Sequence, residues 1–303
     1  MSRFYRRFSP SRIAIYAALW TWAVVCLFPL YWLGLASIKS VGDLARAPSY
    51  VPFLDFMPSL AAWRFILGDP ADSLVWSFLN SLLSAGTAAI AAVVISGLAI
   101  YGITRFPVRR RWPGLLQRPL IVIILATRLV PPVLVALPLY MMAQASGLFD
   151  TRGLLIGVYT AFNLPVALLL LVPVFGTRAT PEEEAAQIDG ASHFEICFGI
   201  LFPMLRGPLA FTGLVIFLLC WNEYLFAAYL TSGHAQTLTL WMAGQISIKE
   251  AQAGGDAEEL SHMAAASVFM ALPAIALAAA IQHHIARSLA STVWGGKTDA
   301  ERE

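Results

Sequence analysis

One acidic segment holds the clearest pattern of residues that could engage another molecule. It opens with Thr180-Pro181-Glu182-Glu183-Glu184 and lies between long apolar stretches. Threonine followed three residues later by glutamate has the spacing of a capping box, in which each side chain accepts a bond from the other residue's backbone N–H. Proline suits the first position of a helix, and carboxylates in the first turn suit the positive end of its dipole. The segment therefore predicts a short helix with a charged surface.

This predicted helix covers residues 180–190, because Gly190 supplies the left-handed turn that often ends a helix. Capping alone fits an ordinary surface helix in a loop, so the first turn by itself does not indicate a further role.

Two further charges interrupt apolar stretches that are otherwise uncharged. Arg128 lies within residues 119–142, and Glu223 lies within residues 207–231. If these stretches cross a membrane, Arg128 is roughly 15 Å past Arg118, where a charge is costly and is a functional candidate by default. Two interpretations stay open. Either Arg128 pairs with Glu223 or with helix carbonyls, or it lines a pathway and contacts an anionic substrate.

No other constellation supports catalysis or metal binding. Gly296-Lys297-Thr298 matches the end of a phosphate-binding loop, but the pattern requires glycine where Ser291 stands. His283 and His284 are adjacent, so on a helix they point in different directions. The three cysteines form no CxxC pair and no even-numbered disulfide framework. We therefore predict no enzyme activity, no metal site and no cofactor bound by this chain.

The composition is that of an all-α polytopic membrane protein. Of the 303 residues, 58% are hydrophobic and 13% are charged, whereas soluble domains carry roughly 25% charge. The net charge of +2 is too small to indicate a nucleic-acid partner. A helix needs about 20 apolar residues to cross a bilayer. Six stretches meet that requirement, at approximately 13–36, 76–104, 119–142, 153–177, 207–231 and 260–286.

These spans divide the chain into an N-terminal tail of residues 1–12, a membrane domain of residues 13–286 and a C-terminal tail of residues 287–303. Fourteen lysines and arginines lie in the tails and in the two even-numbered connections, against five in the other connections. Because cytoplasmic loops carry the excess of positive charge, both termini and the acidic segment are predicted to be cytoplasmic. The longer outer segments, 37–72 and 232–259, either contact a partner or are solvated loops.

The acidic segment also resembles a known motif. Glu184-Ala185-Ala186 is followed by Gly190 and then by Ile200 and Pro203, the spacing of the EAA loop in permease subunits of binding-protein-dependent ABC importers. Trp221-Asn222-Glu223 and Leu272-Pro273 resemble the carbohydrate branch of that family. The likeness covers nearly the whole chain. Within the family, the chain most resembles the six-span permease subunit of the maltose-transporter type.

The resemblance implies a transport assembly in a bacterial inner membrane. It comprises this multi-pass chain among membrane lipid, a second homologous permease subunit, two ATPase subunits and an external substrate-binding protein. ATP and magnesium are expected on the ATPase subunits, and a carbohydrate or sugar derivative is expected as the substrate. The motif helix is then a coupling helix that docks in a cleft of the ATPase subunit, with carboxylates at the rim, alanines permitting close approach and glycine forming the exit turn. The residues implied are Glu183, Glu184, Ala185, Ala186, Asp189 and Gly190.

Four polar residues in the spans are candidates for the substrate pathway, namely Arg128, Asn163, Asn222 and Glu223. Two alternative functions are weighed. One is an importer of the same superfamily for another small solute, such as a polyol, a glycerophosphate-like compound or an amino acid. The other is an ion-coupled secondary transporter, which usually has several ionisable groups in its spans, whereas this chain has two.

Overall fold

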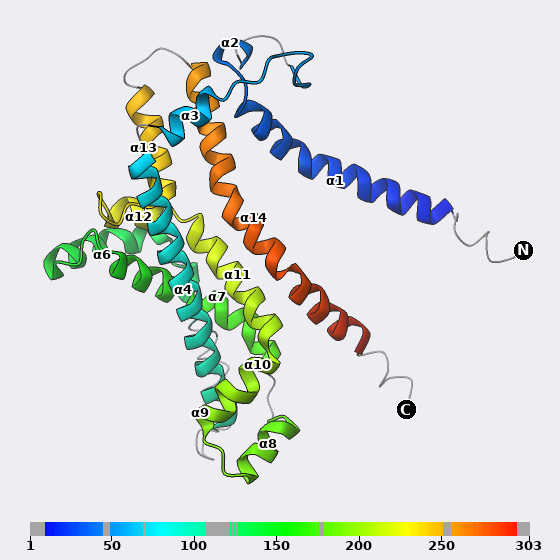
Figure 1. Ribbon diagram of the computed structural model, residues 1–303. Coiled ribbons are helices and arrows are strands. Elements are labelled where there is room, and N and C mark those ends of the chain that lie inside the picture. The colour runs from blue at the N-terminus through cyan, green and yellow to red at the C-terminus, as the bar shows by residue number, and fades with distance from the viewer. Residues whose placement is uncertain are drawn as a thin grey trace, which may run out of the picture. The chain divides into compact units, whose positions relative to one another are not determined.

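The computed structural model describes residues 10–44, 49–68, 71–106, 122, 124, 126–175, 179–250 and 256–295 (Figure 1). These residues contain helices and no strand, which confirms the all-α prediction. The first helices are α1 (Pro10–Ala36), α2 (Val41–Leu44), α3 (Ala61–Leu67), α4 (Ala71–Arg105), the 3₁₀ turn η2 (Thr127–Leu129), α6 (Pro132–Ser146) and α7 (Arg152–Phe175). They are followed by α8 (Pro181–Ile188), α9 (His193–Glu195), the π-helical turn η3 (Ile196–Leu201), α10 (Phe202–Met204), α11 (Arg206–Trp221), α12 (Leu225–Leu230), α13 (Leu238–Glu250) and α14 (Asp256–Gly295).

The chain divides into two compact units. Unit 1 comprises residues 1–74 and 242–272, and unit 2 comprises residues 75–241 and 273–303. In unit 1, α1 has apolar residues on every side, and most of its apolar stretch is exposed, apart from Leu35 and Ala36 at its end. A helix that is hydrophobic all round suits a membrane or a protein interior rather than water.

Lys39 organises the segment of unit 1 that follows α1. Its side chain is 3% exposed, and its Nζ donates to the carbonyl of Ser49 at 2.6 Å. The ammonium group also lies 4.6 Å from the ring centre of Trp32 and 5.1 Å from that of Phe56. Carbonyl and aromatic contacts both favour a cation. This part of the predicted outer segment therefore packs around the buried Lys39 side chain.

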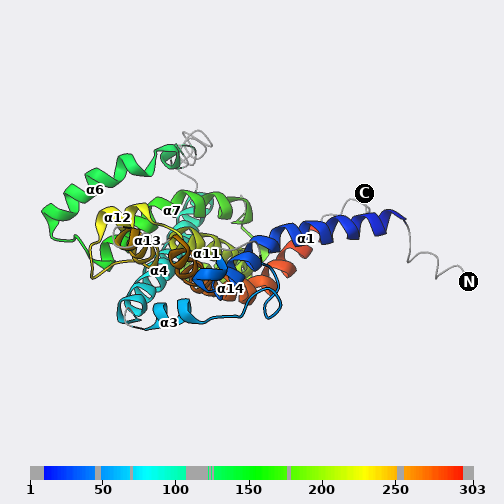
Figure 2. The same cartoon turned by 90° about the horizontal axis from the view of Figure 1, so that it is seen from above.

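In unit 2, small residues let α4 pack closely against its neighbours. Ala88 and Ala92 are fully buried, and a Cβ placed on Gly213 of α11 would lie 3.8 Å from Val93 of α4. Phe78 of α4 packs edge-on against Trp221 of α11. Figures 1 and 2 show α11 packing along α7, and α6 packing against α12.

Within the described ranges, four helices are long and apolar enough to cross a membrane, and they correspond to the predicted first, second, fourth and sixth spans. Their apolar parts are Ile13–Ala36, Ser73–Arg105, Arg152–Phe175 and Leu260–Ala280. The last of these belongs to α14, which continues to Gly295 and so extends helical structure into the predicted C-terminal tail.

The predicted fifth span, 207–231, is not one continuous helix. α11 ends at Trp221, three non-helical residues follow, and α12 begins at Leu225. At its other end α11 meets the helix over His193–Met204 at an angle of 82°. At the break after Trp221, the Glu223 carboxylate reaches forward and accepts hydrogen bonds from the N–H groups of Phe226 and Ala227 at the start of α12, which a continuous helix would have used internally.

The predicted third span, 119–142, lies partly outside the described residues, and its described part is interrupted. The turn η2 ends at Leu129, and α6 begins at Pro132. Pro131 and Pro132 both lack an N–H, and a residue before proline is driven away from helical geometry. Consecutive prolines therefore separate the turn from the helix. The count of six spans stays a prediction, as does the N-terminal tail, most of which lies outside the described residues.

Candidate coupling helix and pathway cavity

The acidic segment forms the predicted helix with the predicted cap. The N–H of Glu183 donates to Thr180 Oγ1 at 3.3 Å, and the N–H of Thr180 donates to Glu183 Oε1 at 3.2 Å. Pro181 occupies the first helical position, and the helix ends at Ile188 with Asp189 as its C-cap. Gly190 follows with a φ of +84°, a conformation that glycine adopts without steric cost.

Glu183 does not lie at the rim where the resemblance placed it. Its side chain is fully buried, and both carboxylate oxygens accept bonds from Arg105 at the end of α4. Burial opposes ionisation of this carboxyl, but the bonds from Arg105 and Thr180 outweigh it and hold the pKa of Glu183 below its ordinary value. In the sequence, Arg105 counts only as one of the cytoplasmic charges, so its role as a partner of Glu183 was missed.

The other motif residues divide between an outer and an inner face. Glu182, Glu184, Ala185 and Asp189 are exposed, whereas Ala186 is half-buried against a hydrophobic cluster. Ile188 is 87% exposed even though it is a large apolar residue. The outer face of α8 therefore combines carboxylates with an apolar side chain that has no cover within this chain's described residues.

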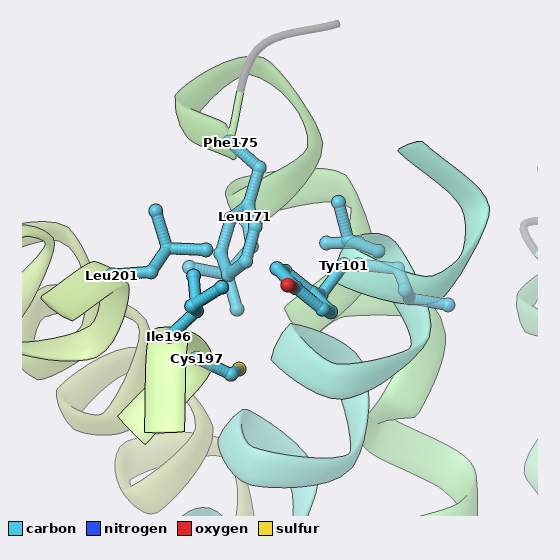
Figure 3. Packing of buried hydrophobic residues seen from close by; sticks show 8 residues of the cluster. Tyr101, Leu171, Phe175, Ile196, Cys197 and Leu201 are labelled. Carbon is cyan, nitrogen blue, oxygen red and sulfur yellow. The ribbon is translucent and has the colours of Figure 1, made fainter. Parts of the chain in front are cut away.

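The hydrophobic cluster beneath α8 joins three parts of unit 2 (Figure 3). It contains Ile100 and Tyr101 from α4, Leu168, Leu171 and Phe175 from α7, and Ile196, Cys197 and Leu201 from η3. Tyr101 also shares a hydrogen bond of 3.0 Å with His193 Nδ1. At Gly97 of α4, a Cβ would approach the ring of Phe202 to 2.8 Å, so glycine permits the close contact with α10. The cluster fixes α8 and the following turns to α4 and α7.

Three of the four predicted pathway residues meet at one cavity of about 180 Å³. Arg128, Asn163 and Glu223 line it together with Tyr159, Phe162, Pro132, Leu219, Leu225 and Phe226. Asn222 does not line it: the residue is exposed, and its amide donates to the carbonyl of Leu218 at 2.8 Å. Tyr159 was not predicted, because a tyrosine within an apolar stretch gives no separate signal.

Arg128 binds a helix carbonyl, which is one of the two structural contacts expected for it. Its Nη1 donates to the carbonyl of Phe162 at 3.1 Å, and the guanidinium carbon lies 4.3 Å from the centre of that residue's ring. The expected ion pair between Arg128 and Glu223, both of which the structure describes, is not formed. Among the described residues, Arg105 and Glu183 form an ion pair.

The carboxylate of Glu223 accepts hydrogen bonds from neighbouring groups of the chain. Tyr159 donates its hydroxyl to Oε2 at 3.0 Å, and the N–H groups of Phe226 and Ala227 donate to the carboxylate at 2.8 and 3.2 Å. The carboxylate thus caps α12, where a negative charge is favoured. Asn163 donates its amide to the carbonyl of Tyr159 and to the sulfur of Cys220, whereas its Oδ1 is buried and has no partner in the described structure.

A second polar network involves Asp150, in the turn between α6 and α7. Its carboxylate accepts from the backbone N–H groups of Ser232, Gly233, His234 and Ala235, and from the hydroxyl of Ser232. Burial opposes ionisation here too, but the four N–H donors outweigh it and lower the pKa of Asp150 to about 2. This carboxylate shapes the start of the predicted outer segment 232–259.

The long apolar helices define a class of protein, the membrane-embedded proteins with several spans. Comparison with known proteins identifies the family. The model of the "binding-protein-dependent transport system inner membrane component" family matches residues 108–291. The chain belongs to this family.

Relatives of the chain are permeases for sugars. It is 30% identical over 267 residues to the melibiose/raffinose/stachyose import permease MelC of Bacillus subtilis, with 87% of this chain and 89% of MelC covered. It is 28% identical to the trehalose/maltose transport permease MalG of Thermococcus litoralis, with 91% and 94% covered.

The fold matches a solved structure over almost its full length. A chain of a bacterial ABC transporter that imports the acidic polysaccharide alginate aligns with a TM-score of 0.68 and 19% identity, covering 93% of this chain and 98% of that one. The family match and the relatives together identify the protein as a permease subunit of a binding-protein-dependent transport system, and a subunit of this family is not itself catalytic.

Proposed function

We propose that α8 is the coupling helix through which an ATPase subunit drives this permease. The observation that supports the proposal most strongly is the division of α8 into an anchored inner face and an exposed outer face. On the inner face Glu183 is fully buried against Arg105. On the outer face Glu184 and Ala185 are exposed, and Ile188 is 87% exposed.

The outer face has the chemistry of a docking surface. An exposed apolar residue surrounded by carboxylates gains free energy by entering a cleft that covers the apolar group and provides positive charges at the rim. The small side chain of Ala185 permits close approach at the same surface. Docking therefore involves Glu184, Ala185, Ile188 and Asp189, whereas Glu183 acts inside the permease.

Movement of the docked helix passes to the spans through Arg105. Its guanidinium bonds Glu183 of α8 and the last helical carbonyl of α7, at Phe175, with Nη2 to oxygen distances of 2.9 and 3.1 Å. Because Ala186 also packs on the cluster shared by α4, α7 and η3, α8 cannot shift without moving the ends of these helices. Closing of an ATPase dimer would then change the access of the membrane pathway.

The full assembly proposed is a pair of homologous permease subunits, two ATPase subunits that bind ATP and magnesium, and an external substrate-binding protein. We further propose six spans, an even number that puts both termini on one side of the membrane. The excess of positive charge in the tails and in the segments on that side supports the cytoplasm as this side, with α8 on it. The relatives' names favour a carbohydrate of oligosaccharide size. The experiment that tests coupling is copurification of the ATPase subunit with a tagged permease, together with uptake in proteoliposomes.

Ile188→Asp places a charge where the apolar docking contact is proposed. We expect it to release the ATPase subunit from the purified complex, or to leave ATP hydrolysis without uptake. The matched control is Leu54→Asp, because Leu54 is 83% exposed on the segment predicted to face outward. It should leave the ATPase subunit bound. Normal uptake and copurification by Ile188→Asp would refute docking through α8.

A further inference from the structure

We propose that the cavity between η2, α7, α11 and α12 is a binding subsite for a carbohydrate that bears an anionic group. This goes beyond coupling by α8 and does not depend on it, whereas a carbohydrate as the ligand rests on the substrate class proposed above. The inference rests on which of the polar groups lining the cavity are already occupied and which are left for a ligand.

Arg128 is the group that can bind an anion. A guanidinium has five N–H donors, and the described contacts of Arg128 use one, the bond from Nη1 to the Phe162 carbonyl at 3.1 Å. Stacking 4.3 Å above the Phe162 ring leaves the edge of the planar group available for further hydrogen bonds. A charge at this depth is retained where it meets a partner or a water-filled pathway.

Glu223 is not the counter-ion of Arg128, although both line the cavity. Its two carboxylate oxygens accept one hydroxyl and two backbone N–H groups at 2.8–3.2 Å. These bonds close the N-terminus of α12, so turning the carboxylate toward Arg128 would leave those N–H groups without a partner. Among the described residues no carboxylate therefore pairs with Arg128, and its positive charge is available to a bound anion.

Asn163 provides a second, independent pointer to a ligand. The residue is 5% exposed and lines the same cavity. Its amide nitrogen is used by Tyr159 and Cys220, while its Oδ1 is buried without a donor among the described residues. A buried acceptor without a donor is unfavourable. Less than 1 Å² of Oδ1 is accessible in this structure, so the Asn163 side chain must turn toward the cavity for a ligand hydroxyl to donate to it.

The cavity thus offers a ligand two different groups. The guanidinium of Arg128 can donate hydrogen bonds to an anion, and Oδ1 of Asn163 can accept a hydrogen bond. A sugar acid matches both, because its carboxylate accepts from Arg128 and a ring hydroxyl donates to Asn163. A phosphorylated or sulfated sugar has the same shared chemistry. The cavity of about 180 Å³ far exceeds the roughly 10–15 Å³ that admits one water, so there is room for part of a ligand.

Equilibrium dialysis of the purified full complex in lipid nanodiscs tests the subsite, with radiolabelled glucuronate, glucose 6-phosphate and glucose as probes. No ATP and no binding protein are added, so a failure of coupling does not affect the result. We expect both anionic probes to bind at least about tenfold more tightly than glucose, because a hydrogen bond to a charged group contributes about 1.5–3 kcal/mol. Equal binding of glucose, or no binding of either anion, would overturn the proposal.

Variants assign the effect to the cavity. Arg128→Met should remove the preference for the anions, and Arg128→Lys should retain much of it. Asn163→Leu should weaken all three sugars alike while the preference for the anions remains. Arg64→Met removes an exposed arginine on α3 that does not line the cavity, and it should bind like the wild type. An Arg128→Met complex that keeps the full preference would place the anion elsewhere and overturn the subsite.

Discussion

Arg105 and Glu183 are joined by two parallel hydrogen bonds although 78 positions separate them in the chain. Arg105 Nε lies 2.8 Å from Oε2 of Glu183, and Nη2 lies 2.9 Å from Oε1. Their side chains are 4% and 0% exposed. Bidentate pairs of this kind are strong and fix the orientation of both partners. The pair joins the end of α4 to the first turn of α8.

Breaking this pair should uncouple the transporter. Arg105→Met leaves the Glu183 carboxylate buried without its counter-charge, a change that costs about 3–5 kcal/mol for buried pairs. We expect a less stable complex in which ATP is hydrolysed without uptake. The double variant Arg105→Met, Glu183→Met removes both charges and should recover stability. Thermal unfolding and the ratio of uptake to hydrolysis measure the two effects. An Arg105→Met protein with wild-type stability and coupling would contradict this role.

The turn at Gly190 should tolerate no β-branched residue. At a φ of +84°, a non-glycine residue costs about 1–2 kcal/mol, and Gly190→Val should misdirect the chain that leaves α8. We expect normal membrane insertion with loss of coupled uptake. Gly199→Val is the matched control, because a Cβ at either glycine has open space but only Gly190 has a positive φ. If Gly190→Val supported coupled uptake as well as Gly199→Val, the turn at Gly190 would not be required for coupling.

The charge bias predicts the orientation of the loops. In a background without Cys26, Cys197 and Cys220, a cysteine at position 110 should react with a membrane-impermeant maleimide only in inverted vesicles. A cysteine at position 254 should react in right-side-out vesicles. The physical reason is the excess of lysine and arginine in the segments assigned to the cytoplasm. The reverse labelling pattern would put α8 on the outer side and exclude docking of an ATPase there.

Asp150 should stabilise the outer loop in a manner that does not vary near neutral pH. Its folded pKa of about 2 lies below the unfolded value of about 3.9. The stabilisation is therefore fully present above the unfolded pKa and is lost as pH falls through the folded pKa. Asp150→Asn should lower the Tm of the complex by the same amount at pH 7 and pH 5. If the difference in Tm between the wild type and Asp150→Asn disappeared between pH 7 and pH 5, the carboxylate would titrate in that range.

The local parts of this protein could be predicted from residue types and spacing. Thr180 and Glu183 specify their capping box because both partners lie within one turn of the same helix. The long apolar helices were also predictable, since each stretch requires removal from water whatever lies beside it. The interruption of the fifth span was not predictable, because it depends on hydrogen bonds that Glu223 accepts from the backbone of α12 and from the hydroxyl of Tyr159.

The sequence by itself determined the all-α class, the positions of four long apolar helices, the capped acidic helix and the membership of a permease family. Only the tertiary structure decided which carboxylate of that helix faces inward. Successive residues on a helix point about 100° apart, so Glu183 and Glu184 face different directions, and it is Glu183 that binds an arginine 78 positions away. It likewise brought Arg128, Asn163 and Glu223 to one cavity while leaving Asn222 outside, because packing of α7 against α11 and α12, not spacing along the chain, sets which side chains meet.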